Sequence, residues 1–281
     1  MESQQLPFGA TRYCDLAYVS NGHERQKLDL YLPAQGENHP LIIWIHGGAF
    51  RMGSKEGNAD DPLPFEYLDQ GFALASINYR LSQDAIFPAQ IEDCKAAVRW
   101  LRTHAARFNL DPARFIAWGP SAGGHLAAML GTTGHLRVFD VGDYLDVSSR
   151  VQGVVDYFGP TDFSQMDAQR LPDGQIHNAP DSPESELVGG PIQENQVKVA
   201  QASPITYITG DAPPFLIIHG DRDPLVPYGQ SQLLVAALQA AGAPVTFYTV
   251  AGAGHGHFTD PQAPKLTQAF LANYITRDCP R

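Results

Sequence analysis

Short apolar runs recur along the chain, with segments of helical periodicity between and after them. Six runs are almost continuously hydrophobic, as expected of strands covered on both faces of a parallel sheet; they are 41–45, 72–77, 114–118, 151–157, 215–219 and 245–250. Two earlier runs, 13–20 and 26–32, alternate more and predict an antiparallel entry to that sheet. Helices are predicted at 89–108, 122–130, 230–241 and 265–275. Alternating strands and helices indicate an α/β fold with right-handed crossovers.

One segment, 161–213, interrupts this alternation because it is rich in Pro, Gly, Asp and polar residues. Long structureless loops are uncommon in compact domains unless they are functional. We therefore expect a loop-rich, lid-like insertion or a pocket wall; the alternative is a surface excursion that does not contact substrate. The chain has 281 residues, a length that α/β folds commonly form as one domain, so a single domain over 1–281 is expected.

Charge and cysteine content exclude several classes of function. A formal net charge of −11 argues against nucleic acid or an anionic membrane as a partner, since both require a basic face. The cysteines, Cys14, Cys94 and Cys279, form neither a disulfide framework nor a zinc motif, so no metal site is predicted. No apolar stretch approaches the roughly 20 residues of a membrane span. The first residues lack the features of a signal peptide, so we expect a cytoplasmic protein, or a secreted or periplasmic one if a leader was removed.

A turn between the strand at 114–118 and the helix at 122–130 carries the pattern G-x-S-x-G, from Gly119 to Gly123. This strand–turn–helix context is the one in which the pattern places a nucleophile. The turn strains its serine, and small flanking residues let strand and helix approach each other. Ser121 is therefore the predicted nucleophile.

A serine hydroxyl needs a base to accept its proton, and in this arrangement the partners follow in the order Ser, acid, His. "AGAGHGHF" offers His255 and His257, directly after the strand at 245–250. We favour His255, which follows the Gly-rich turn directly and can be carried over the strand ends. The alternative, His257, is expected only to line the site.

The acid should follow a strand between the serine and the histidine. "FLIIHGDRDPLVP" offers Asp221 and Asp223, and a carboxylate there would hold the imidazole in one tautomer. We favour Asp223, because Pro224 stiffens the backbone after it. Asp221 has the position of a turn-forming aspartate.

The stretch "WIHGGAFRMG" at 44–53 supplies a Gly-rich turn after a strand. Acyl transfer needs backbone N–H groups directed at a developing oxyanion. Gly47, Gly48 and Ala49 are the candidate donors, joined by Ala122 after the nucleophile. His46 is expected to brace this loop.

Taken together, these pieces resemble an α/β-hydrolase, and more narrowly the bacterial esterases with an H-G-G-x-[WF] oxyanion motif, in the hormone-sensitive-lipase-like carboxylesterase group. "INYRLS", "GPSAGGHLAAMLGT", "FGPTD", "SPITYI" and "HGDRDPLVPYGQS" resemble the feruloyl or acetyl esterases of carbohydrate breakdown. The resemblance covers about residues 12–275. It implies a mostly parallel eight-stranded sheet flanked by helices, and ester hydrolysis without a cofactor by Ser121, Asp223 and His255.

Two departures from the family pattern concern backbone groups. Ala49 stands where relatives usually have a third Gly, and Pro120 precedes the nucleophile. Neither removes a catalytic group. Expected substrates are short-chain acyl esters of small molecules or carbohydrates. An amidase, formamidase or peptidase with the same triad, and an inactive binding protein on the hydrolase fold, are the alternatives; no oligomeric state is predicted.

Overall fold

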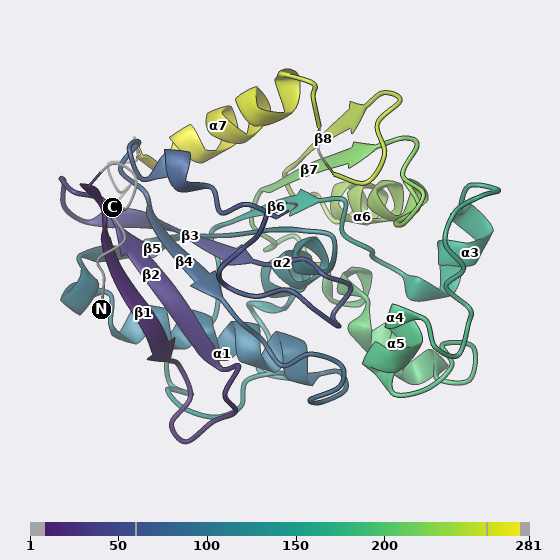
Figure 1. Cartoon of the computed structure of the whole chain (residues 1–281), viewed down its shortest axis with the longest axis horizontal. Helices are drawn as coiled ribbons and strands as arrows, with labels where there is room; N and C mark the ends of the chain where they lie inside the picture. The colour runs from purple at the N-terminus through teal and green to yellow at the C-terminus, as the bar shows by residue number, and fades with distance from the viewer. Residues whose placement is uncertain (1–8, 60, 257, 276–281) are drawn as a thin grey trace.

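The computed structural model describes residues 9–59, 61–256 and 258–275. Eight strands form one sheet in the order β1-β2-β4-β3-β5-β6-β7-β8 (Figure 1). Their bounds are β1 Thr11–Ala17, β2 Lys27–Leu32, β3 His39–Ile45, β4 Ala73–Ile77, β5 Leu110–Pro120, β6 Gly153–Tyr157, β7 Phe215–Gly220 and β8 Val245–Val250. β2 pairs antiparallel with β1 and β4, and every other pair is parallel. The predicted parallel sheet with an antiparallel entry is confirmed.

The four longest helices match the predicted segments: α1 Ala89–Thr103, α2 Ala122–Thr133, α6 Gly229–Ala240 and α7 Gln262–Ile275. The helix expected over 89–108 ends early, at Thr103, and a separate 3-10 turn, η3, follows at Ala106–Phe108. Asn109 has a left-handed backbone (φ 54°). It turns the chain back into β5, which a continuous helix could not do.

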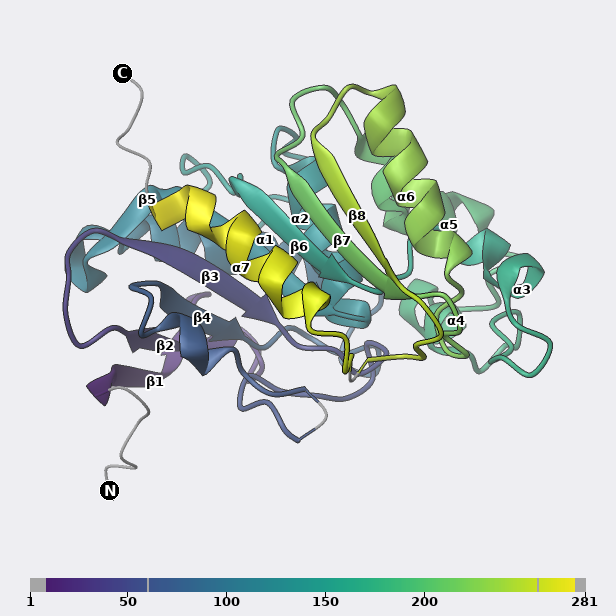
Figure 2. The ribbon, with the colours of Figure 1, turned by 90° about the horizontal axis from the view of Figure 1, so that it is seen from above.

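Helices cover both faces of the sheet, α1 and α2 on one side and α7 on the other (Figure 2). Successive residues of β3 point to opposite sides: Ile43 packs in the core cluster with α1, α2 and α6, and Ile42 in the cluster with α7. Both faces are therefore dry, which explains the continuous hydrophobicity of the central strands.

The segment 161–213 is more ordered than its composition indicates. It forms α3 Met166–Gln169, α4 Pro183–Val188 and α5 Gln196–Ala202, with the 3-10 turns η4 Phe163–Gln165 and η5 Pro204–Tyr207, and the three helices lie together beside the sheet (Figure 1). Its buried apolar side chains, including Phe163, Met166 and Leu187, belong to the same core cluster as α1 and α2. Scattered apolar residues thus anchor the segment in the core.

The carboxyl ends of β3, β5, β7 and β8 reach the same edge of the sheet, since these strands run parallel with paired registers. The 3-10 turn η2, Phe65–Tyr67, lies on the connection from β3 to β4. Loops that follow parallel strands form the usual binding crevice of such sheets.

Over the residues that the structure describes, no helix combines the length and apolar character needed to cross a membrane.

Candidate active site

Ser121 lies in a strained turn between β5 and α2. Its φ of 54° and ψ of −121° place a non-glycine residue in a region that L-residues rarely occupy. The Ser121 N–H donates to the Tyr157 carbonyl of β6 at 2.8 Å, and the Ser121 carbonyl accepts the His125 N–H at 3.0 Å. The strain is thus held by hydrogen bonds to the neighbouring strand and to the helix.

Close backbone packing explains the glycine two residues after this serine. A Cβ atom on Gly123 would lie 1.9 Å from the carbonyl oxygen of Ile45, at the end of β3. A side chain there would push the start of α2 away from the sheet. Only glycine lets the positive end of the α2 dipole sit beside the loop that follows β3.

Asp223 follows β7, and its side chain is fully buried. Oδ1 accepts the backbone N–H groups of Leu225 and Val226 at 2.8 and 2.9 Å. Oδ2 accepts a hydrogen bond from Nδ1 of His255 at 2.6 Å. This pairing leaves Nε2 of His255 as the nitrogen that can exchange a proton with substrate or serine.

A second histidine, absent from the sequence-based predictions, also contacts this carboxylate. Nε2 of His219 lies 3.1 Å from Asp223 Oδ2 and 3.0 Å from the Val226 carbonyl, and Nδ1 lies 2.8 Å from the Ser231 hydroxyl. Two acceptors at Nε2 assign the proton to that nitrogen, so Nδ1 accepts from Ser231. The only signal in the sequence was a histidine at the end of an apolar strand, four residues before the acid.

These contacts decide the charge of Asp223. Burial alone would raise the pKa of its carboxyl group, but the hydrogen bonds from His219 and His255 outweigh burial and hold that pKa well below its usual range. Asp223 therefore remains an anion that can stabilise a positively charged imidazole.

His255 and Ser121 line one cavity of about 370 Å³, together with residues of the loop after β3. The His255 ring packs edge-on against Phe158, with ring centroids 4.6 Å apart. Asp221 plays a different role, because its Oδ1 accepts the Gly252 N–H at 2.7 Å and closes the turn after β8. The alternative base, His257, lies outside the described residues.

The loop after β3 has three successive residues with positive φ: Gly48 at 105°, Ala49 at 54° and Phe50 at 61°. Ala49 therefore adopts the backbone that a third glycine would favour. Phe50 is buried and packs edge-on against His125, which anchors the loop to α2. Within the residues that the structure describes, the N–H groups of Gly48 and Ala49 donate to no acceptor, and both residues line the cavity with Ser121.

Gly47 is a different case. Its N–H donates to Oδ2 of Asp61 at 2.9 Å, so it is not available to an oxyanion. The prediction of Gly47 as a donor is corrected accordingly. Ala122 is the first residue of α2, where an N–H has no acceptor within the helix. The other predicted donors, Gly48, Ala49 and Ala122, have no acceptor among the described residues, and their role in an oxyanion hole stays a prediction.

His46 braces the loop, as expected. Its Nδ1 lies 2.7 Å from the Gly47 carbonyl, and its Nε2 lies 3.2 Å from the Arg25 guanidinium. The ring stacks on Tyr79, whose hydroxyl donates to the His46 carbonyl at 3.0 Å. Burial, assisted by Arg25, outweighs the bond to Gly47 and lowers the pKa of His46 to about 4, so the ring is neutral.

Two further cavities border the site. One of about 430 Å³ shares Asp61, Pro120, Phe158 and Gly256 with the Ser121 cavity. Its remaining walls are rich in aromatic side chains: Trp44, Tyr67, Trp118, Tyr157 and Phe258.

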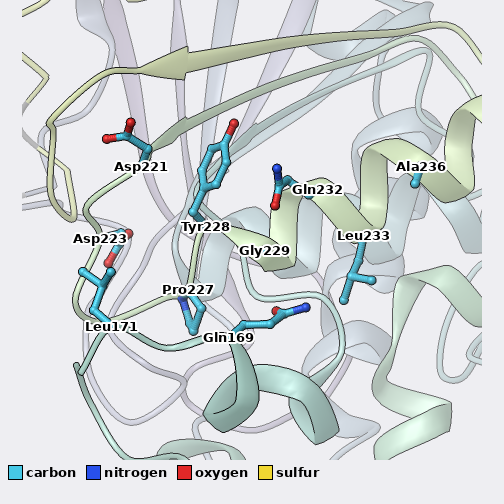
Figure 3. A pocket seen from close by; sticks show the side chains of 10 residues that line it. All are labelled: Gln169, Leu171, Asp221, Asp223, Pro227, Tyr228, Gly229, Gln232, Leu233 and Ala236. Carbon is cyan, nitrogen blue, oxygen red and sulfur yellow. The ribbon is translucent and has the colours of Figure 1, made fainter. Parts of the chain in front are cut away.

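The other cavity, of about 450 Å³, lies between the 161–213 segment and α6, with Leu171, Asp223 and Tyr228 in its wall (Figure 3). Among the described residues, none of 161–213 lines the Ser121 cavity. The segment instead contacts the loop that carries Asp223, where the Gln175 N–H donates to the Pro224 carbonyl at 2.8 Å. Its role as a lid or pocket wall stays a prediction.

The polar side chains of the Ser121 cavity come from three loops. Asn58 and Asp61 lie on the connection after β3, Ser121 lies on the turn after β5, and His255 lies on the loop after β8. No group of three or more His, Cys, Asp or Glu side chains within the described ranges could hold a metal ion.

Comparisons with known proteins agree with this arrangement. The family model BD-FAE matches residues 28–238. A solved structure described as a truncated carbohydrate esterase from gut microbiota superposes with a TM-score of 0.86 at 36% identity, covering 95% of this chain and 97% of that one. A bifunctional GH43-CE protein of Bacteroides eggerthii reaches a TM-score of 0.83 at 36% identity over 94% of this chain and 38% of its own.

Esterase LipQ of Mycobacterium tuberculosis is 31% identical over 89% of this chain; the chain spans 58% of the length of that relative. The family model covers most of the sheet, the nucleophile turn and the Asp223 loop. The chain has the α/β-hydrolase fold, and it belongs to the BD-FAE family.

Proposed function

We propose that the protein is a serine carboxylesterase that hydrolyses short-chain acyl esters, among them acetyl or feruloyl esters of carbohydrates. One observation carries the proposal. A histidine bonded to a buried, anionic aspartate shares a cavity with a serine on a strained turn, and two backbone N–H groups without an acceptor among the described residues line the same cavity. This combination supports nucleophilic acyl transfer, which needs a nucleophile, an oriented base and unoccupied N–H donors within one cavity.

The reaction follows from the roles of these groups. Ser121 Oγ attacks the ester carbonyl carbon while Nε2 of His255 takes the hydroxyl proton. The carbonyl oxygen becomes an oxyanion, which the N–H groups of Gly48, Ala49 and Ala122 stabilise. The carbon–oxygen bond to the alcohol then breaks, and His255 gives its proton to the leaving alkoxide. Water repeats the sequence on the acyl-enzyme and releases the acid.

The size and lining of the cavities support the substrate class. The 370 Å³ cavity suits a short acyl group or one sugar unit, and the adjoining aromatic cavity offers flat apolar surfaces to a phenyl ring. The relatives described as carbohydrate esterases are compatible with this class. We propose good hydrolysis of acetyl to butyryl esters and poor hydrolysis beyond about ten acyl carbons, because the polar segment 161–213 offers no sustained apolar face at helical spacing to cover a long chain.

The test is kcat/KM along a p-nitrophenyl series from acetate to palmitate, followed by methyl ferulate and an acetylated xyloside. A fluorophosphonate probe should label wild type and fail to label Ser121→Ala. A maximum at palmitate, with a jump in rate above the solubility limit of the substrate, would identify a lipase instead.

Two other functions are separated from this one by experiment. An amidase or peptidase would use the same triad, and comparison of matched acetyl ester and acetanilide substrates distinguishes it by a preference for the amide. A catalytically inactive binding protein would show no burst of nitrophenol from p-nitrophenyl acetate, whereas an esterase releases it.

A further inference from the structure

Asp61 is a charged side chain at the site that the proposed reaction does not use. It lies in the connection from β3 to β4, and it lines both the Ser121 cavity and the adjoining aromatic cavity. Asn58 fixes its backbone on both sides: the Asn58 side chain accepts the Asp61 N–H at 3.0 Å, and the Asn58 N–H donates to the Asp61 carbonyl at 3.1 Å. The carboxylate is therefore presented from a closed turn.

The contact that Asp61 makes is with the start of the oxyanion loop. Its Oδ2 accepts the Gly47 N–H at 2.9 Å. That N–H belongs to the peptide between His46 and Gly47, whose carbonyl oxygen accepts the Tyr79 hydroxyl. The peptide plane is thus held at both ends, by one side chain on each side of the loop.

The next peptide carries one of the proposed oxyanion donors. Its carbonyl oxygen, from Gly47, faces Nδ1 of His46 at 2.7 Å, and its N–H is that of Gly48. Because Gly48 and Ala49 have positive φ and few side-chain atoms to restrain them, the direction of their N–H groups depends on how the preceding peptides are held. Small errors in such directions are costly, since displacement of about 1 Å can lower a rate about 10²-fold.

We infer that Asp61 is a positioning residue of the oxyanion hole: by accepting the Gly47 N–H it holds the loop so that the N–H groups of Gly48 and Ala49 point at the developing oxyanion. The inference rests on the proposed esterase function, and it adds a residue that touches none of the reacting atoms.

The burial of Asp61 lowers the stability of the folded protein. Oδ1 of Asp61 is buried and has no partner among the described residues, and burial raises the pKa of this carboxyl group to about 6 although the Gly47 N–H opposes that rise. A buried polar atom without a partner typically costs about 1–3 kcal/mol. Asp61 thus destabilises the folded protein, and its side-chain hydrogen bond goes to the loop that carries the proposed oxyanion donors. This combination favours a role in the site over a role in stability.

Two substitutions separate bonding from charge. Asp61→Asn retains a carbonyl oxygen that can accept the Gly47 N–H, whereas Asp61→Ala removes the acceptor. The matched control is Asp69→Asn, because Asp69 is an exposed carboxylate a few residues away that lines a separate hollow with Pro33 and Gly71. Each full-length protein is assayed for kcat and KM on p-nitrophenyl acetate, for inhibition by an aryl trifluoromethyl ketone, and for Tm.

The inhibitor reports on the oxyanion hole directly. Ser121 Oγ adds to its ketone carbon, His255 takes the proton, and the resulting oxyanion requires the same N–H donors as the transition state. For Asp61→Ala we expect kcat to fall about 10- to 100-fold with KM changed less than about threefold, and the inhibition constant to rise in proportion. Asp61→Asn should stay within about fivefold of wild type, and Asp69→Asn should match wild type.

Two results would overturn the inference. One is an Asp61→Ala enzyme with wild-type kcat and inhibition constant. The other is an Asp61→Asn enzyme as impaired as Asp61→Ala, which would mean that charge and not the hydrogen bond matters. Failure of the proposed function is recognised separately, since wild type itself would then neither hydrolyse the ester nor bind the ketone.

Discussion

The two halves of the site are held together in different ways. The nucleophile turn depends on backbone contacts: Ser121 is fixed by main-chain hydrogen bonds, and Gly123 leaves no room for even a Cβ beside Ile45. The acid–base half depends on side chains, since Asp223 is held by His219 and His255 as well as by two backbone N–H groups. A substitution that adds atoms to the backbone-packed half should therefore lower activity, and so should one that removes hydrogen-bonding atoms from the acid–base half.

The largest expected effect comes from removal of one catalytic group from either half of the site. Ser121→Ala or His255→Ala should each lower kcat about 10⁴- to 10⁶-fold, because neither the hydroxyl nor the base acts without the other. The double variant should lose about as much as either single one. Single-turnover and steady-state rates on p-nitrophenyl acetate measure this, with circular dichroism to show that the fold is retained. Losses that multiply would mean that the two residues do not act as a unit.

Next in size is the addition of one methyl group to the backbone-packed half. Gly123→Ala places a Cβ 1.9 Å from the Ile45 carbonyl oxygen, and it should lower kcat about 10²-fold or more and reduce Tm. The control is Gly210→Ala, whose Cβ would lie 3.2 Å from the nearest atom, the Ala241 carbonyl oxygen, far along the chain from Ser121. Equal kcat and Tm in the two variants would contradict the close-packing argument.

Removal of a side chain's hydrogen-bonding atoms tests the other half. His219→Phe keeps a ring in the core but removes the Nε2–H bond to Asp223, and we expect kcat to fall about tenfold. His219 is one of the groups that lower the pKa of Asp223, so that pKa should rise in the variant. The stability that Asp223 contributes is present above its unfolded pKa of about 3.9 and is lost as pH falls through its folded pKa.

The acid-unfolding midpoint of His219→Phe should therefore move to higher pH than that of wild type. Circular dichroism as a function of pH measures the shift. Asp221→Asn serves as the control, because the Asp221 carboxylate accepts the Gly252 N–H and not the His219 ring, which bonds to Asp223. An unchanged midpoint together with unchanged kcat would remove His219 from the acid–base half.

The smallest effect concerns a buried carboxyl group beside the nucleophile turn. Asp156, on β6 opposite Gly119, takes no part in the proposed reaction; its Oδ1 accepts the Gly159 N–H at 2.8 Å, and burial raises its pKa to about 7. The folded protein then keeps a proton that the unfolded chain has lost, so stability falls as pH rises from about 4 to about 7. Asp156→Asn should remove this fall.

The measurement is Tm of wild type and Asp156→Asn at about pH 5 and about pH 8. We expect similar values at the lower pH and a Tm roughly 5 °C higher for the variant at the upper one. If the difference in Tm between the two proteins does not grow with pH, Asp156 ionises without loss of stability. The nucleophile half would then tolerate a buried charge, as the acid–base half does at Asp223.

Much of the fold was predictable because local pattern reports local structure. Continuous apolar runs predicted the central strands, because both faces of those strands are buried. The alternation in 26–32 predicted an antiparallel strand, but its polar residue Asp29 is buried as well, where it pairs with Arg12 and Lys55. The end of α1 at Thr103 was missed, because the left-handed backbone at Asn109 serves the return into β5 and leaves no periodic signal.

The candidate site likewise has parts that local sequence patterns predict and parts that depend on contacts between distant segments. The sequence by itself placed Ser121, Asp223 and His255 in loops after strands, because glycine-rich turns and the order of residues along the chain constrain which strand ends they follow. Only the tertiary structure decided that His219 joins Asp223, that Asp61 occupies the Gly47 N–H, and that 161–213 lies behind the acid. Hydrogen bonds and cavities form between segments that packing brings together, and a pattern read along one segment does not contain the position of the other.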